Sequence, residues 1–365
     1  MTSHAVVIPT VGRPSLELTL WSLVEESPES PLPDEVIVVN DRPLTRLVPM
    51  LPPALADRTR VVAGPGRGPA AARNVGWRAA SADWVVFVDD DVVPLPSWPR
   101  DLVRDLAEAA PEVAGVQGVI EVPLPDRPTD WERQVAGLAT APWITADMAV
   151  RRGVLDEVGG FDERFPRAYR EDTDLALRLR AAGYELARGK RRAEHPVGPA
   201  GPWVSVRRQR GNADDALLRR RYGPDWRRLA GAPRGRRPWH AATTVCAAAA
   251  LLAFAARRRT PAVLAGAAWL ALTADFAARR IAPGPRTPRE VATMVATSAA
   301  IPPAATAYWL RGWYAHRDVP RLRGVPPPGG DPRGRTRDTM RRTGEPRGRA
   351  DDARRGADDR FGAAR

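Results

Sequence analysis

The sequence feature that most limits the fold is an apolar run, Trp84 to Val88, that leads directly into three carboxylates, Asp89, Asp90 and Asp91. The run predicts a buried strand. Adjacent carboxylates at a strand end repel one another and raise each other's pKa unless a cation shares the site. We therefore expect either a solvated acidic turn or a site for Mg²⁺ or Mn²⁺ that the phosphates of a substrate complete.

Length and composition indicate a folded domain with an anionic partner. The 365 residues are 44% hydrophobic, enough for a sizeable core, and the net charge is +13. Nucleic acid, an anionic membrane face and phosphorylated substrates all fit this charge. Cys246, the single cysteine, excludes an intramolecular disulfide and is expected to be a small buried hydrophobe. No signal-peptide pattern opens the chain, so we expect the N-terminal domain to stay in the cytoplasm.

The first two thirds of the chain alternate short β-rich runs with helical patterns. This alternation predicts an α/β fold with a largely parallel sheet and helices on both faces. The strands are expected at 5–8, 35–39, 59–62 and 84–88, with helices after Pro14 and over about 70–81. Asn40 and Asp41 follow the second strand, at the carboxyl edge where open α/β sheets bind ligands. Gly64, Gly66 and Gly68 predict a flexible connector, because their spacing is not a dinucleotide fingerprint.

In order and content, these motifs resemble the inverting nucleotide-sugar glycosyltransferases of family 2, which have the GT-A fold. That fold has a Rossmann-like, mostly parallel sheet with flanking helices. The resemblance covers about residues 5–190. It rests on VVIPT, VIVVND, AAARNVGWRAA, FVDDD, the GGFDE step at 159–163 and REDTDLALRLRAAGYEL at 170–186. Each segment alone is a weak signal, whereas the ordered set is specific.

The resemblance implies a donor site at the carboxyl ends of the strands. The residues that would hold the base, ribose and diphosphate are Pro9, Thr10, Asn40, Asp41, Arg73, Asp89 and Asp90. Arg42 and Pro43 stand where the family commonly has Gly and Ser, which leaves the donor base open.

The resemblance also implies Mn²⁺ or Mg²⁺ between Asp89 and Asp91. The metal would bridge the diphosphate and stabilise charge on the leaving nucleotide. His195, in an E-H-P step after the last strand of the domain, is a further candidate ligand. The alternative for a lone histidine is a surface or packing role.

Two carboxylates, Glu171 and Asp172, open a predicted helix. Taken alone, they would be caps or partners of the helix dipole. By the resemblance, Asp172 matches the general base that takes a proton from the acceptor hydroxyl. Glu171 and Asp174 are the alternatives, and helical spacing favours a structural role for Asp174.

The segment between the two carboxylate sites is similar to the floor of the family's acceptor site. The resemblance implies acceptor contacts for Asp147, Gly160 and Phe161. Asp147 could equally cap a helix that begins near Ala149.

The last third of the chain changes character. Residues 201–238 are dense in Arg with interleaved Trp, Leu and Tyr, which favours an amphipathic helix on an anionic membrane or against a lipid-linked phosphate. Three apolar segments follow, at about 239–256, 261–278 and 291–310, each near the length of a membrane span. A soluble Ala-rich bundle is the alternative. A hairpin of the first two would carry Arg257, Arg258 and Arg259 to the far side, against the positive-inside tendency.

We therefore predict four parts. They are a GT-A catalytic domain at 1–200, a basic amphipathic helical segment at 201–238, an apolar helical membrane region at 239–318 and a disordered tail at 319–365. We expect a metal-dependent enzyme of the cell membrane, with its catalytic domain on the cytoplasmic side. It would move a sugar from a nucleotide-diphosphate sugar to a lipid-linked or cell-envelope glycan. The alternatives are a nucleotide-sugar-binding scaffold without turnover and a basic nucleic-acid-binding protein. We expect no nucleic-acid partner, because no nucleic-acid motif accompanies the arginines.

Overall fold

A computed structural model describes residues 2–24, 30–42, 44–322 and 324–326. The first elements are β1 (His4–Thr10), α1 (Ser15–Ser22), β2 (Glu35–Asn40), η1 (Pro53–Arg58), β3 (Thr59–Ala63), α2 (Pro69–Ala79), β4 (Trp84–Val88), β5 (Val93–Pro94) and α3 (Trp98–Glu108). They are followed by β6 (Val113–Glu121), α4 (Asp130–Ala136), η2 (Gly137–Ala139), β7 (Asp147–Arg151), α5 (Arg152–Val158), α6 (Glu171–Ala181) and β8 (Glu185–Glu194). The last are α7 (Val204–Arg207), η3 (Arg208–Gly211), α8 (Asn212–Tyr222), α9 (Trp226–Leu229), α10 (Arg237–Ala255), α11 (Arg259–Ile281) and α12 (Pro288–Ala315).

The strands form one mixed sheet in the order β3-β2-β1-β4-β7-β6-β8-β5. β1 to β4 are mutually parallel, which confirms the four predicted strands. β7 runs antiparallel to both β4 and β6. The expected helix near Ala149 is therefore wrong, because Met148, Ala149 and Val150 are buried between two neighbouring strands and pair with them.

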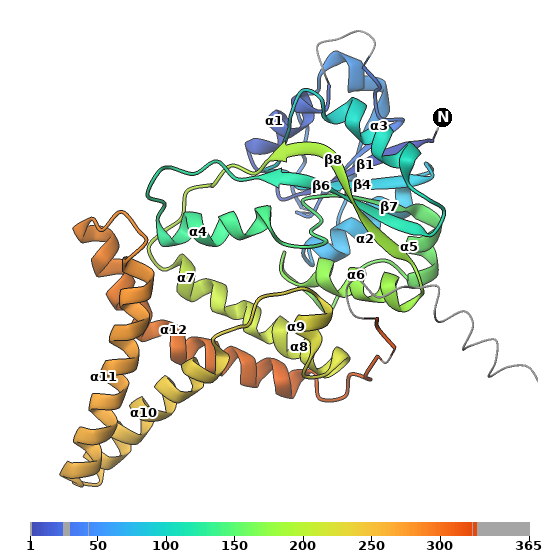
Figure 1. Cartoon of the computed structure of the whole chain (residues 1–365). Helices are drawn as coiled ribbons and strands as arrows, with labels where there is room; N and C mark the ends of the chain where they lie inside the picture. The colour runs from blue at the N-terminus through green and yellow to red at the C-terminus, as the bar shows by residue number, and fades with distance from the viewer. Residues whose placement is uncertain (1, 25–29, 43, 323, 327–365) are drawn as a thin grey trace, which may run out of the picture. The chain divides into compact units, whose positions relative to one another are not determined.

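Helices cover both faces of the sheet, as predicted (Figure 1). Alternate residues of β1 divide between two cores, with Val6 and Ile8 on one side and Ala5 and Val7 on the other. The first core is closed by α1 and α3, and the second by α2, α5 and α6. Because both faces are buried, the ligand-binding positions lie at the ends of the strands.

The Arg-rich segment does not form the single surface helix that we predicted. It is divided into α7, η3, α8 and α9. Its apolar residues Leu217, Leu218 and Trp226 lie in a third core with Phe165 and Leu177 of the catalytic part. The apolar side of this segment thus packs against protein and not against a membrane.

All three apolar segments are helices, but they differ in burial. α12 packs against α8, where Gly312 lies so close to Ala213 that a Cβ would come within 2.5 Å of its backbone. α10 and α11 lie side by side and remain largely exposed (Figure 1). Val319, Leu322 and Val325 pack on the third core, so the part of the predicted tail up to residue 326 that the structure describes is ordered. The rest of the predicted tail, like Pro43, lies outside the described residues.

Candidate active site

The parallel strands bring the first motif residues to one edge of the sheet. Thr10 ends β1, and its hydroxyl donates to Asp90 Oδ2 at 2.6 Å, just after the neighbouring β4. Pro9 is buried within β1, opposite Val39 of β2. Arg13 donates to Asp90 Oδ1 at 3.0 Å and to Asp91 Oδ2 at 2.5 Å. Sequence reasoning missed Arg13, although its place three residues after the Pro-Thr step put it within reach of the carboxylates.

The glycine-rich loop is held by Asp41 and is not a free connector. Asp41 Oδ1 and Oδ2 accept from the backbone N–H groups of Gly66 and Gly68, both at 2.8 Å. A Cβ on Gly64 would lie 2.8 Å from Asp41 Oδ1, so the close approach requires glycine. Asn40 binds its own turn, accepting from Arg42 N and donating to Thr45 O. Asn40 and Asp41, two of the predicted donor-binding residues, therefore shape loops at this edge of the sheet.

Arg73 of α2 joins two carboxylate groups that lie far apart in the sequence. It is 1% exposed, and its guanidinium donates to Asp89 Oδ1 at 2.6 Å and to Glu171 Oε1 at 2.8 Å. Burial lowers the pKa of Arg73, but the charges of Asp89 and Glu171 outweigh it and raise the pKa overall. Arg73 Nε and Glu171 Oε2 are buried without a hydrogen-bond partner in the described part of the chain. Such unsatisfied atoms are unusual and often mark a functional site.

The carboxylates that open α6 have different surroundings. Glu171 is buried, and burial together with the charge of Asp172 raises its pKa to about 8, against the effect of Arg73. Asp172 is half-buried, and its Oδ1 accepts from the N–H of Thr173 at 2.6 Å. Burial raises the pKa of Asp172 as well, opposed by Thr173 and Arg73. A half-buried carboxylate with a raised pKa has the properties of a general base.

Asp174 has the structural role that its spacing favoured. It is fully buried, and its two oxygens accept from Arg178 Nε at 2.8 Å and from the Tyr222 hydroxyl at 2.7 Å. Asp174 therefore fixes α6 against α8 and does not face the site of Asp172.

The residue before the carboxylate pair adopts a left-handed backbone conformation. Arg170 has φ 77°, which costs a non-glycine residue about 1 kcal/mol or more. Its side chain is held by Asp215 Oδ1 of α8 at 2.9 Å and lies over the Trp226 ring. The neighbouring Asp214 binds Arg167 through both oxygens. We call the contact between Arg170 and Asp215 the clamp. Sequence reasoning missed it, although two adjacent aspartates within an arginine-dense stretch were an available signal.

The three carboxylates after β4 are those at which the sequence predicts a divalent cation. Burial and the charge of Asp89 raise the pKa of Asp91, and burial is the main cause that raises the pKa of Asp90. A cation would relieve this repulsion. His195 Nε2 lies 3.5 Å from Asp91 Oδ1, which brings the third predicted ligand to the same place. The residues that the structure describes contain no group of three or more metal-ligating side chains, so a bound substrate would have to supply further ligands.

The predicted acceptor contact at Asp147 needs correction. Asp147 is completely buried at the start of β7, and its two oxygens accept from Trp98 Nε1 and Arg191 Nε, both at 2.8 Å. A carboxylate enclosed in this way cannot reach a bound acceptor. It caps no helix, since it is the first residue of a strand.

Gly160 and Phe161 form a turn that packs against α2. The backbone N–H of Phe161 donates to Asn74 Oδ1 at 2.8 Å, and its carbonyl accepts from Asn74 Nδ2 at 2.9 Å. Gly160 has φ 68°, and a Cβ there would lie 2.5 Å from Asn74 Oδ1. The turn thus requires glycine, and Asn74, whose position in the A-R-N motif was the signal, holds it next to Arg73.

The fold is thus a GT-A-like mixed sheet with flanking helices, and Arg73 joins the two carboxylate groups at its edge. The sequence model described as "Glycosyl transferase family 2" matches residues 5–161. Residues 5–161 thus belong to glycosyl transferase family 2, and the chain carries a glycosyltransferase domain.

One curated relative is the "Pre-mycofactocin glycosyltransferase" of Mycobacterium tuberculosis, 33% identical over 135 residues. The match covers 33% of this chain and only 28% of that relative. Among solved structures, the mannosyltransferase PcManGT from Pyrobaculum calidifontis in complex with GDP-Man and Mn²⁺ is 20% identical, with a TM-score of 0.45 and 86% and 87% of the two chains covered. GalNAc-T7 with UDP, GalNAc and Mn²⁺ is 15% identical, with a TM-score of 0.46 and coverage of 65% and 51%.

Proposed function

We propose that the protein is a metal-dependent, inverting glycosyltransferase that uses a nucleotide-diphosphate sugar. The observation that carries the proposal is the Arg73 bridge. It joins Asp89, on the donor side, to Glu171, the neighbour of Asp172. The predicted donor site and the predicted base therefore belong to one continuous ion-pair network.

In this proposal the residues around the carboxyl ends of β1, β2 and β4 hold the donor. They are Pro9, Thr10, Asn40, Asp41, Arg73, Asp89 and Asp90. Mn²⁺ or Mg²⁺, held by Asp89 and Asp91 with His195 as a further ligand, would supply positive charge for the diphosphate. Gly160 and Phe161 would lie on the acceptor side, without Asp147.

Asp172 acts as the general base. It takes the proton of an acceptor hydroxyl while the hydroxyl oxygen bonds to the anomeric carbon. The bond from that carbon to the diphosphate oxygen breaks, and its electron pair leaves with the nucleotide diphosphate. One displacement inverts the anomeric configuration, and the proton on Asp172 then passes to water.

We propose a lipid-linked or cell-envelope glycan as the acceptor, at the cell membrane with the catalytic domain in the cytoplasm. The exposed apolar helices α10 and α11 support this location. The name of the mycobacterial relative adds pre-mycofactocin to the acceptors worth testing.

Nucleotide release tests the proposal directly. With UDP-, GDP- and dTDP-sugars offered in turn, we expect one donor to be consumed with Mn²⁺ or Mg²⁺ and release to cease with a chelator. Asp91→Asn should abolish release, because a ligand to the ion is lost. The matched control is Asp57→Asn, at an exposed position away from the site, which should keep full activity.

Other outcomes would favour the alternatives. Nucleotide binding without release of nucleotide from any donor would indicate a binding protein. Tight, salt-sensitive DNA or RNA binding that survives Asp91→Asn would indicate the nucleic-acid function.

The clamp before α6 gives a second prediction. Asp215→Asn should lower kcat by roughly tenfold to a hundredfold with little change in donor KM, because Arg170 then no longer fixes the start of α6 and Asp172 shifts. Asp214→Asn is the matched control, since Asp214 lies beside Asp215 but binds Arg167. Steady-state kinetics and the melting temperature of both variants are measured together. Equal losses of kcat in the two variants would mean that the clamp is merely structural.

A further inference from the structure

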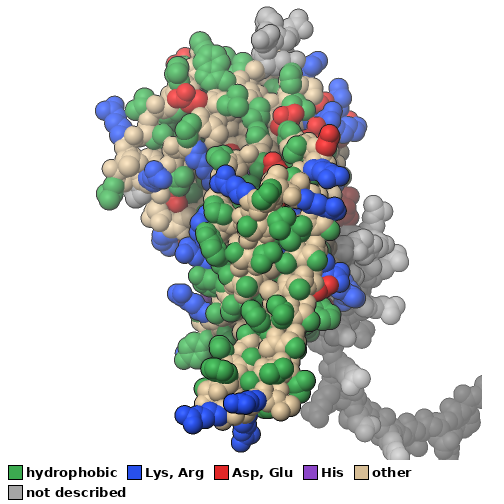
Figure 2. Space-filling view, turned by 90° about the vertical axis from the view of Figure 1, so that its left-hand side faces the viewer, with side chains coloured by type: hydrophobic (Ala, Val, Ile, Leu, Met, Phe, Trp, Pro, Cys, Tyr) green, Lys and Arg blue, Asp and Glu red, His purple; other side chains and the backbone are tan. Residues whose placement is uncertain are grey.

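Helices α10 and α11 expose apolar side chains that no part of the described chain covers. Thr243 is the one buried residue among the 19 of α10, all of which the structure describes. In α11, likewise described throughout, only Thr273, Ala277 and Arg280 are buried. The large apolar side chains that are 57–79% exposed are Trp239, Val245, Leu251, Leu252, Phe254, Val263, Leu264 and Leu270. Figure 2 shows this apolar surface. A contiguous exposed apolar surface rimmed by charged residues marks a site of contact with a protein or a membrane.

The two helices lack the polar face of a helix that lies flat on a membrane. Residues 241–256 and 260–274 contain no charged side chain. In α10 the exposed apolar residues Val245, Leu251 and Phe254 point to different sides of the helix, since successive residues turn by about 100°. A helix that is apolar all round is buried in protein or spans a membrane. Because α10 and α11 are exposed in the structure, the bilayer is the environment that fits.

The length of the hairpin matches a bilayer. From Trp239 to Arg257 the helix rises by about 27 Å, and from Arg259 to Asp275 by about 24 Å, at 1.5 Å per residue. The hydrocarbon core is about 30 Å thick, and arginine side chains at the tip extend the reach to the far headgroups. Both helices also meet the length and hydropathy of a membrane span.

Charge orients the hairpin. The tip carries three arginines, Arg257, Arg258 and Arg259, and Figure 2 shows basic side chains at this end. Six arginines flank the base, namely Arg234, Arg236, Arg237, Arg279, Arg280 and Arg286. Because six arginines flank the base and three lie at the tip, the base is placed on the cytoplasmic side. With the arginines outside the two segments counted, the hairpin agrees with the positive-inside tendency. Trp239 at the base is 57% exposed, as expected for an interfacial anchor.

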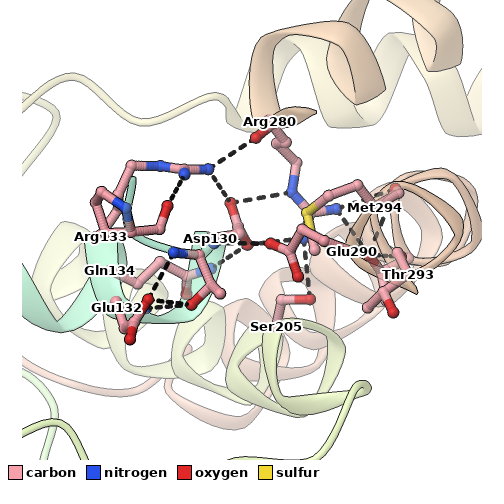
Figure 3. Close-up of polar contacts among 12 residues, drawn as sticks. Asp130, Glu132, Arg133, Gln134, Ser205, Arg280, Glu290, Thr293 and Met294 are labelled. Atoms are coloured by element: carbon pink, nitrogen blue, oxygen red, sulfur yellow. Dashed lines mark hydrogen bonds and ion pairs between the residues drawn. The ribbon is translucent and has the colours of Figure 1, made fainter. Parts of the chain in front are cut away.

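Arg280 fixes the base of the hairpin to the catalytic part. It is 7% exposed and donates to Asp130 Oδ2 of α4 at 2.8 Å and to Ser205 Oγ of α7 at 3.1 Å. It also donates to Thr297 Oγ1 and Ser298 Oγ of α12. Glu290 of α12 accepts from the backbone N–H of Asp130 (Figure 3). A charge so fully paired inside protein marks the point where α11 leaves the apolar environment.

We propose that α10 and α11 form a hairpin that crosses the lipid bilayer, with Arg257–Arg259 at the far headgroups and both helix ends on the side of the catalytic domain. The assignment of that side to the cytoplasm rests on the arginine count and agrees with the proposed function, whereas the crossing itself is independent of that function. α12 does not cross, since it packs on α8, so the chain returns to the side from which it left. The junction at Arg280 then holds the catalytic domain at a fixed distance from the membrane surface.

The single cysteine allows a direct test in a bacterial host. Cys246 lies within α10, so in the unmodified protein we expect it to resist a membrane-impermeant maleimide until detergent is added. In a Cys246→Ser background, Arg258→Cys should be labelled from outside in intact spheroplasts. Glu108→Cys, at an exposed site of the catalytic domain, is the matched control and should be labelled only in inverted membrane vesicles.

Labelling is independent of catalysis, so the hairpin and the glycosyltransferase activity can fail separately. If Arg258→Cys and Glu108→Cys are labelled from the same side, the hairpin does not cross. If the unmodified protein stays in the soluble fraction and Cys246 reacts without detergent, no bilayer covers the helices. The second result needs no substitution, so a misfolded variant could not produce it.

Discussion

Asp172→Asn is expected to lower kcat for sugar transfer by a factor of about 10²–10⁴, because the acceptor hydroxyl loses its proton acceptor. Donor binding should change little, since Asp172 lies on the far side of the Arg73 bridge from Asp89. Asparagine keeps the size of the side chain and can still accept from the N–H of Thr173. Single-turnover transfer and nucleotide binding, measured on the same sample, separate the two effects.

Asp174→Asn is the matched control for this prediction. Asp174 lies one half-turn along the same helix but is bound to Arg178 and Tyr222. Its substitution should lower the melting temperature and leave kcat per folded molecule close to that of the wild type. If Asp174→Asn stops transfer while Asp172→Asn does not, the base has been assigned to the wrong carboxylate.

The pH profile adds a readout specific to a base. Burial raises the pKa of Asp172, and Thr173 and Arg73 oppose this rise. Transfer by the wild type should therefore rise with pH as Asp172 loses its proton, above the usual range of an aspartate. In Asp172→Asn this rise should disappear. An unchanged profile in the variant would exclude Asp172 as the titrating group.

Much of the fold could be predicted because its signals are local. Short runs of β-branched and aromatic residues such as 84–88 favour strands by themselves. The motifs that follow them lie at one sheet edge because parallel strands share that edge. β7 was missed because Asp147 opens it, and a carboxylate in a central strand is possible only with the buried partners Arg191 and Trp98. Those partners come from α3 and β8, so no local pattern announces them.

The site, like the fold, could be predicted where its signals are local and could not where they depend on distant partners. The carboxylates at 89–91 and 171–172 are visible in the sequence as charged residues next to apolar runs. The residues that position them are not, because Arg13, Arg170 and Asp215 act through ion pairs across 45–78 positions of sequence. Sequence spacing cannot tell a solvated arginine from one that is buried and paired. The Arg-rich segment was misjudged for this reason, since its aspartates and leucines face the catalytic part.

Arg73→Met should give the largest loss of stability, about 3–5 kcal/mol in the free energy of unfolding. Methionine fills a similar volume but leaves Glu171 as a buried carboxylate without its cation, and it frees Asp89. Transfer should fall as well, because the donor and base sides of the site are no longer tied together. Arg78→Met, on the exposed side of the same helix, is the matched control and should cost less than about 0.5 kcal/mol.

The loss of unfolding free energy in Arg73→Met should also grow as pH rises, and the direction of this pH dependence follows from the ionisation of Glu171. In the folded wild type the pKa of Glu171 is already raised from 4.5 to about 8, so its contribution to stability is present at low pH and is lost as pH rises toward 8. Removing Arg73 raises the folded pKa further, so the ionised form becomes still less favourable. Urea unfolding at pH 5 and pH 8.5 should therefore show a larger difference between wild type and variant at the higher pH. If the stability difference between wild type and variant is equal at pH 5 and pH 8.5, Arg73 stabilises the fold by packing alone. The bridge to Glu171 then does not set the charge of the two carboxylates Glu171 and Asp172.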